Sequence, residues 1–428
     1  MKRILILAYD FPPHTSVAAA RPSSWFRYFK THGMQPVVVT RHWDLPLNSP
    51  EDTLRKSKNQ KVSVETDESG TIIRVPHHPW QRHFGFKPSG PAATIRKMIS
   101  FLISVLRYTS FWFEPDKKIY LEARNYLLAN KTDCILATGE PFYLFRFASG
   151  LSKEFGVPWI ADYRDGWSQN QLNVLQTGIP GRIKQWSDRF QERRISSTAT
   201  AITAAAPSYL QSVLSVLNKP ILNKVIYNGY EEAPGSQSHQ QVSPDLFTIA
   251  YSGRLYPHYP LEEFIQALAA FQQEFPENRI QLHCLGLAFY PDEVKRIEKA
   301  AQDTGLLLKL SHRLAYPEYM AELRKARLCL LFGVPGISWL NAKIFDYFYA
   351  GRKVMLYRND HAVLESLINL TNSGFCCNNA SELNLKLKEL YTEFNETGDV
   401  ACNPVHIEQF SRKNQAFEMT ELIKKCVE

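Results

Sequence analysis

Short apolar runs alternate with longer amphipathic stretches along most of this chain, and that alternation constrains its fold more than any other feature. The apolar run at residues 3–9 is followed by a helical stretch from about Ala18 to His32, and then by a second apolar run at residues 35–40. A similar series begins at residues 247–251. Because strands joined by helical crossovers pair in parallel, the sequence predicts an α/β fold with two parallel sheets.

The length of 428 residues is too great for one compact core and predicts about two domains. Polar clusters follow the expected strands in each half, so we expect two Rossmann-like domains that face each other across a cleft. We place their limits as follows: an N-terminal domain at 1–230, a polar linker at 231–245, a C-terminal domain at 246–403, and a terminal segment at 404–428 whose helix returns toward the N-terminal domain.

The formal net charge of +8 points to anionic partners, such as nucleotide phosphates, lipid phosphates or a membrane surface. The basic residues are dispersed and no zinc-finger or RNA-binding signature is present, which argues against nucleic acid. Three of the seven cysteines lie in apolar runs, as expected in a reducing compartment. No C-x-x-C or H-E-x-x-H pattern occurs, so we expect no metal site. The first apolar run is cut by Asp10, and is too short for a signal peptide or a spanning helix.

The segment from His77 to Phe113 is basic and aromatic. Such a segment suits the boundary between a protein and a membrane, with rings at headgroup depth and cations on lipid phosphates. An alternative is that residues 99–113 form a core helix.

A helix end at residues 338–356 is the first candidate binding site. Asn341 is placed to cap a short helix that ends at Gly351, and a buried strand follows. The free N–H groups of such a helix end suit a phosphate, and Lys343 adds positive charge. Asp346 shares the helix face of Lys343 and is placed to accept hydrogen bonds from a sugar hydroxyl. The alternative is an ordinary solvated ion pair.

Two loops at strand ends in the first half form the second candidate site. The loop at residues 10–16 contains Pro13 and His14 but no G-x-G-x-x-G, which argues against a dinucleotide site. The segment 162–167 brings two carboxylates and a guanidinium together, and one carboxylate could act as a general base. The alternative is that salt bridges simply lock this loop.

Four motifs in this order along the chain carry a resemblance to a known family. They are Tyr9-Asp10-Phe11-Pro12-Pro13 with Arg21; Asp162-Tyr163-Arg164-Asp165-Gly166-Trp167; Tyr227-Asn228-Gly229-Tyr230; and Tyr251-Ser252-Gly253-Arg254-Leu255 with Lys343-Ile344-Phe345-Asp346-Tyr347. With them the chain resembles GT-B-fold glycosyltransferases of the family-4-like retaining group, in the branch found in bacterial capsule, O-antigen and exopolysaccharide synthesis.

The resemblance implies a nucleotide-sugar donor and assigns roles to individual residues. Arg254 and Lys343 would hold the donor diphosphate, Asp346 would take the ribose hydroxyls, and Gly253 and Asn341 would complete the donor site. The segment 162–167 and the loop at residues 10–16 would face the acceptor. The charged residues of that segment, Asp162, Arg164 and Asp165, are our candidates for catalysis. The acceptor side would include Pro13, His14, Arg21 and Trp167.

The same resemblance implies an enzyme that needs no metal or other cofactor. Its acceptor would be a saccharide or a sugar on a polyprenyl diphosphate lipid. The enzyme would then be cytoplasmic, with peripheral contact to the inner face of an anionic membrane.

The chain departs from the family pattern at two positions. The first glutamate of the family pair falls at Ser338, and Asp346 replaces the second. The lysine expected after Arg254 is absent, since that region reads Tyr256-Pro257-His258-Tyr259-Pro260. Two other functions therefore stay open: a sugar-nucleotide 2-epimerase of the same fold, and a non-catalytic scaffold that recruits other transferases.

Overall fold

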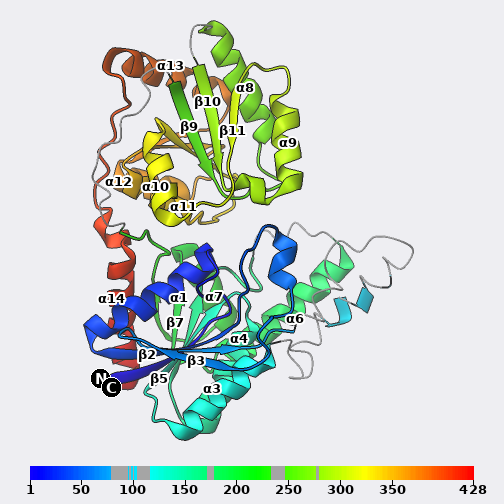
Figure 1. The fold of residues 1–428 in the computed structure, drawn as a ribbon, viewed down its shortest axis with the longest axis vertical. Coiled ribbons are helices and arrows are strands. Elements are labelled where there is room, and N and C mark those ends of the chain that lie inside the picture. Colours follow the sequence, from blue (N-terminus) through cyan, green and yellow to red (C-terminus); the bar gives the residue numbers. More distant parts are fainter. Residues whose placement is uncertain are drawn as a thin grey trace. The chain divides into compact units, whose positions relative to one another are not determined.

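The computed structural model describes residues 1–78, 95, 98–99, 101–103, 116–170, 178–232, 246–275 and 279–428. Internal contacts divide the chain into two compact units, which are described separately here (Figure 1). Unit 1 comprises Met1–Asn228 and Arg412–Glu428, and unit 2 comprises Gly229–Ser411. Most of the segment 77–113 and most of the expected linker at 231–245 lie outside the described residues.

Unit 1 is built on an eight-stranded sheet with the order β3-β4-β2-β1-β5-β6-β7-β8. All neighbouring strands are parallel except β3, which pairs antiparallel with β4. The strands are β1 (Lys2–Leu7), β2 (Met34–Arg41), β3 (Ser63–Thr66), β4 (Thr71–Val75), β5 (Cys134–Gly139), β6 (Trp159–Tyr163), β7 (Ala201–Ala204) and β8 (Leu222–Val225).

Helices cover both faces of this sheet, because alternate residues of its central strand are buried on opposite sides. Ile4 and Ile6 pack with α1 (Val17–Tyr28) and α14 (Arg412–Val427). Leu5 and Leu7 belong to the core on the other face. The helices that contribute to that second core are α3 (Lys117–Ala129), α4 (Tyr143–Phe155), α6 (Ile179–Ser196) and α7 (Pro207–Leu217).

Unit 2 has a six-stranded sheet, parallel throughout, with the order β11-β10-β9-β12-β13-β14. Its strands are β9 (Leu246–Ser252), β10 (Arg279–Leu285), β11 (Leu307–Leu310), β12 (Leu328–Phe332), β13 (Lys353–Tyr357) and β14 (Gly374–Cys377). Its helices are α8 (Leu261–Glu274), α9 (Pro291–Ala301), α10 (Tyr316–Lys325), α11 (Lys343–Ala350), α12 (Val363–Thr371) and α13 (Ala380–Thr397). Short 3-10 turns occupy Phe29–His32, Pro50–Leu54, Leu287–Phe289 and Glu408–Phe410.

The strand order reverses once in each unit. In unit 1, β1 lies between β2 and β5, and in unit 2, β9 lies between β10 and β12. In open parallel sheets, ligands bind outside the carboxyl ends of the strands at this reversal. The predicted α/β class with two parallel sheets is confirmed, and each unit has one position where its topology favours a binding site.

The sequence placed the end of the N-terminal domain at residue 230, and the boundary between the two units falls between Asn228 and Gly229. In the terminal segment 404–428, residues 404–411 belong to unit 2, whereas α14 packs beside α1 in unit 1. Strand β3 was not expected, because its residues are polar and mostly exposed and so lack an apolar pattern.

Candidate functional site

Arg254 leaves the carboxyl end of β9, at the strand reversal of unit 2. The preceding Gly253 has a φ of 84°, a conformation that favours glycine, and this residue turns the chain out of the sheet. Glu293 of α9 then holds the turn, since its carboxylate accepts hydrogen bonds from Arg254 Nε at 3.0 Å and from the backbone N–H of Leu255 at 2.6 Å. The side chain of Arg254 is 47% exposed, so an anion in solution can reach its guanidinium.

The environment of Arg254 keeps it charged. Burial alone would lower its pKa, but the hydrogen bond and the charge of Glu293 outweigh this and raise the pKa. The guanidinium also lies 5.1 Å from the ring centroid of Tyr256 and 4.9 Å from that of Tyr290. Cation–π contacts and an ion pair fix the direction of the side chain, which suits the planar recognition of a phosphate.

Lys343, the first residue of α11, reaches the same strand end. Its Nζ donates a hydrogen bond to the backbone carbonyl of Ser252 at 2.5 Å and lies 3.7 Å from the ring centroid of Tyr251. Burial lowers the pKa of Lys343 to about 7. A dianionic ligand beside this amine would favour its charged form and raise the pKa again. At neutral pH the free Lys343 amine is therefore only partly charged, and an anionic ligand would make it fully charged.

Asp346 lies one turn along α11 and is held by a tyrosine. The hydroxyl of Tyr316 is 3.0 Å from Asp346 Oδ1 and also 3.0 Å from the backbone carbonyl of Glu231. A hydroxyl carries one proton and donates to one of these acceptors at a time. An ionised carboxylate only accepts hydrogen bonds, so a ligand group that bonds to Asp346 would have to be a donor, such as a hydroxyl.

Asn341 does not cap α11, and that expectation is wrong. The helix begins at Lys343, its N-cap residue is Ala342, and no side chain caps it. Asn341 is buried, and its side-chain oxygen accepts a hydrogen bond from the hydroxyl of Tyr259 at 3.3 Å. The side chain of Asn341 thus ties the loop before α11 to a tyrosine of another loop and does not cap the helix. The predicted end at Gly351 is confirmed, with a φ of 67°.

In unit 1, Arg21 and Asp162 form a buried ion pair. Arg21 Nε and one terminal nitrogen lie 3.0 and 2.6 Å from the Asp162 carboxylate. The other terminal nitrogen donates to the backbone carbonyls of Ile226 and Tyr227, both at 2.8 Å. Asp162 also accepts from the hydroxyls of two threonines, Thr138 at 2.8 Å and Thr203 at 2.6 Å.

This arrangement joins α1, three neighbouring strands and the chain after β8 through one carboxylate. Both charged side chains are almost fully buried, with their polar atoms bonded to protein groups. The geometry therefore favours a positioning role for Arg21 and Asp162, and direct contact of either with a substrate stays a prediction.

A more exposed cluster lies at the carboxyl ends of β1 and β6. Arg164 Nε is 3.0 Å from Asp165 Oδ2, and an Arg164 terminal nitrogen is 3.9 Å from Asp10 Oδ2. Burial would lower the pKa of Arg164, but the charges of Asp165, Asp10 and Glu140 raise it. Of the two carboxylates predicted to be catalytic, Asp165 is the accessible one, with its side chain 34% exposed.

His14 belongs to the same strand end. Its Nδ1 is 3.1 Å from Asp10 Oδ1, and its ring stacks on that of Trp43 at a centroid distance of 4.0 Å. The neighbouring Pro13 is exposed. Trp167 is buried and stacks on Phe142, with ring centroids 5.0 Å apart. Its ring therefore anchors the segment 162–167 in the interior of unit 1.

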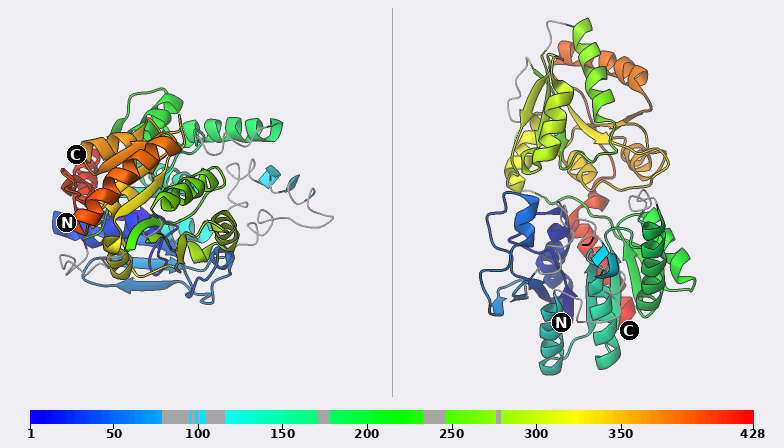
Figure 2. Two further views of the ribbon diagram at one scale, coloured as in Figure 1. Left: turned by 90° about the horizontal axis from the view of Figure 1, so that it is seen from above. Right: turned by 90° about the vertical axis from the view of Figure 1, so that its right-hand side faces the viewer.

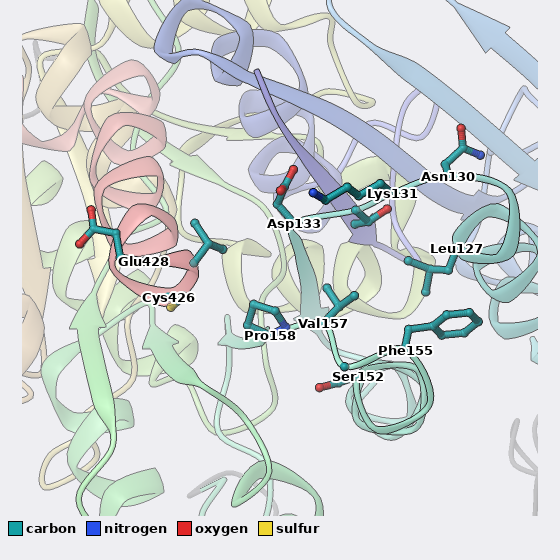
Figure 3. Close-up of a pocket in the computed structure, with 13 residues that line it drawn as sticks. Leu127, Asn130, Lys131, Asp133, Ser152, Phe155, Val157, Pro158, Cys426 and Glu428 are labelled. Carbon is teal, nitrogen blue, oxygen red and sulfur yellow. The ribbon is translucent and has the colours of Figure 1, made fainter.

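Metal ligands and a hollow in unit 1 also bear on the site. No group of three or more His, Cys, Asp or Glu side chains among the described residues could hold a metal ion. A hollow of about 790 Å³ lies between the end of α3, the starts of β5 and β6 and the end of α14, where Lys131, Asp133 and Cys426 contribute to its wall (Figure 3). It is at the amino ends of the strands of unit 1, opposite to the cluster at the carboxyl ends of β1 and β6.

The fold of this chain is similar to those of several solved structures. No family model matches the chain, and no curated protein sequence does. Its structure matches that of sucrose-phosphate synthase from Thermosynechococcus elongatus with a TM-score of 0.65 and 14% identity, over 99% of each chain. It matches HepE of Anabaena in complex with UDP-glucose with a TM-score of 0.61 and 15% identity, over 99% of this chain and 100% of that one. The chain has the GT-B fold.

A third GT-B structure is similar over the same extent. It is an alpha,alpha-trehalose-phosphate synthase (UDP-forming) from Burkholderia vietnamiensis, with a TM-score of 0.60 and 10% identity, over 100% of this chain and 99% of that one. At these identities the matches establish the GT-B architecture of the chain and leave its chemistry to be argued from its own residues.

Three residues of this GT-B chain that shape the two clusters were not found from the sequence. Glu293 orients Arg254, Tyr316 contacts Asp346, and Trp43 supports His14. Each lies far along the chain from its partner, so no spacing rule connects them. The only local signal is the position of Tyr316 and Glu293 close to the expected starts of helices.

Proposed function

We propose that this protein is a glycosyltransferase that moves a sugar from a nucleotide-sugar donor to a saccharide or lipid-linked saccharide acceptor. The observation that carries the proposal is the pair of cations at the end of β9: Arg254, fixed by Glu293, and Lys343, bonded to the Ser252 carbonyl. They lie at the strand reversal of a parallel sheet, the position at which such sheets bind ligands.

On this proposal, unit 2 binds the donor. Arg254 offers paired N–H donors to a diphosphate, and Lys343 adds a point charge that strengthens as negative charge develops on the leaving group. The carboxylate of Asp346 accepts a hydrogen bond from a ribose hydroxyl. These groups stabilise the departing nucleoside diphosphate without a metal.

Unit 1 then binds the acceptor. Asp165 is the carboxylate placed to assist removal of the acceptor proton, Arg164 orients it, and His14 and Pro13 form an adjacent lip. Asp162 and Arg21 hold the strand end in position. We further propose retention of configuration, as in the family-4-like group, and a role in bacterial capsule, O-antigen or exopolysaccharide synthesis. A polyprenyl-diphosphate-linked acceptor and a cytoplasmic protein in peripheral contact with the inner membrane face complete the proposal.

The solved complexes suggest the first donor to test. HepE of Anabaena has been solved with UDP and with UDP-glucose. UDP-sugars are therefore the first class to assay, followed by GDP-sugars.

The test incubates the protein with single nucleotide-sugars, with and without an extract of bacterial lipid-linked saccharides. The transferase releases nucleoside diphosphate only when an acceptor is present, and the acceptor gains the mass of one sugar. Conversion of the sugar-nucleotide without any acceptor would instead identify a 2-epimerase. Absence of both reactions across the donor panel would indicate a scaffold and contradict the proposal.

A further inference from the structure

Helix α6 exposes a continuous apolar stripe. Ile179, Ile183, Trp186 and Phe190 are 74%, 44%, 72% and 55% exposed. Their spacing of four, three and four residues places them on one face of the helix. The rings of Trp186 and Phe190 stack, with centroids 6.2 Å apart. Large apolar side chains gathered in this way on a protein surface mark a binding surface.

The opposite face of α6 is buried and, apart from the core residue Ile195, it is polar. It carries Ser187, Asp188, Gln191, Glu192 and Ser196, of which Glu192 accepts a hydrogen bond from the backbone N–H of Ser168 at 3.1 Å. An ordinary surface helix buries its apolar residues and exposes its polar ones. Because α6 buries mainly polar residues and exposes four of its large apolar ones, this apolar stripe does not contribute to the core of unit 1.

The exposed charges of α6 have one sign. Arg182, Arg189, Arg193 and Arg194 are exposed, whereas both acids of this fully described helix, Asp188 and Glu192, are buried. An apolar stripe with Trp and Phe, flanked by arginines, is the pattern of helices that lie in the interface of an anionic bilayer. A cationic partner surface would repel the exposed arginines, and a neutral one would gain nothing from the positive charge of this face.

We propose that the outward face of α6 docks on an anionic lipid bilayer. The helix lies in the plane of the interface with Trp186 and Phe190 among the acyl chains and the arginines on lipid phosphates. In Figures 1 and 2, α6 stands on the side of unit 1 away from α14. No helix among the described residues is both long and apolar enough to cross a membrane, and α6 with its arginines fits a surface position.

The buried face of α6 is bonded to the segment that carries Asp165. Ser168 donates from its N–H and its hydroxyl to Glu192, and its carbonyl lies 3.5 Å from Gln185 Nε2. Docking of α6 therefore fixes the height of the acceptor segment above the lipid surface. This last step rests on the proposed function and identifies its acceptor as lipid-linked, since a membrane-bound saccharide would be presented at that height.

Vesicle sedimentation tests the docking. The wild-type protein is mixed with vesicles of phosphatidylcholine, or of equal parts phosphatidylglycerol and phosphatidylcholine. The double variant Trp186→Ser/Phe190→Ser is compared with a matched double variant on the exposed side of α3, Leu121→Ser/Leu128→Ser. We expect binding to the anionic vesicles that falls at least about ten-fold in the α6 variant and is unchanged in the α3 variant.

A charge variant and a nucleotide control complete the experiment. Arg189→Gln/Arg193→Gln is expected to weaken binding to anionic vesicles and to reduce its sensitivity to salt. Equal vesicle binding by the wild type and the α6 variant would overturn the proposal. So would a wild-type protein that ignores vesicles but self-associates through α6, seen as a dimer lost in the variant. Titration of the same samples with UDP measures the proposed donor site independently. A variant that loses vesicle binding but still binds UDP is therefore folded and has lost only the membrane contact of α6.

Discussion

The amine of Lys343 and the backbone carbonyl of Ser252 form a 2.5 Å hydrogen bond at the carboxyl end of β9. The same amine faces the ring of Tyr251, and burial lowers its pKa to about 7. A lysine in this state responds to a neighbouring anion by taking up a proton. The proposed donor site thus predicts a signal in addition to binding itself.

We expect UDP binding to be accompanied by proton uptake at about pH 8, where UDP is fully ionised and the free Lys343 amine is mostly neutral. The bound diphosphate favours the charged amine, so uptake approaches about one proton per site. Calorimetric titrations in buffers with different ionisation enthalpies measure this number. Lys343→Met should bind UDP more weakly and take up no proton, whereas identical heats in all buffers for the wild type would show that Lys343 is not beside the phosphates.

The buried pair of Arg21 and Asp162 predicts a large effect on stability. Removing one partner leaves an uncompensated charge inside unit 1, and such changes cost about 3–5 kcal/mol. Arg21→Met and Asp162→Asn are therefore expected to lower the free energy of unfolding measured with urea by about that amount. The control is Arg124→Met, which breaks the exposed pair with Glu154 and should cost less than about 1 kcal/mol. Similar losses in all three variants would contradict the positioning role.

Glu192 predicts a dependence of stability on pH. Burial raises its pKa to about 7, compared with 4.5 for the ordinary side chain. Between these values the folded protein holds a proton that the unfolded chain releases. The stabilisation from this proton is complete below about pH 4.5 and is lost as the pH rises through 7, by up to about 3 kcal/mol.

Glu192→Gln resembles the protonated acid at every pH. Its melting temperature should therefore be close to that of the wild type at about pH 5 and should exceed it increasingly up to about pH 8. Thermal melts of both proteins across this range provide the comparison. A difference that does not change with pH would mean that Glu192 is ionised in the folded protein throughout.

The fold was predictable because its information is local. The apolar run of β1 and the break at Asp10 depend on neighbours in the sequence, and so does the end of α11 at Gly351. Parallel pairing followed from the helices between strands. Strand β3 was missed because an exposed edge strand needs no apolar face.

The site was less predictable because its contacts connect distant residues. Arg254 was named from its position after Gly253, but Glu293, which orients it, comes from another helix. Asn341 looked like a helix cap, yet the loop folds so that it meets Tyr259. In α6 the exposed face became visible only with the structure, because an apolar stripe in a sequence is normally taken as the buried face.

The most direct test of the account is calorimetric titration of the full chain with UDP and GDP. The account predicts saturable binding of one nucleoside diphosphate per chain, weakened about ten-fold or more by Arg254→Ala, since a charge-assisted hydrogen bond contributes about 1.5–3 kcal/mol. Lys299→Ala, an exposed cation on α9, should leave the affinity unchanged. Absence of saturable binding by either nucleotide, or equal affinity in wild type and Arg254→Ala, would contradict a donor site at the end of β9.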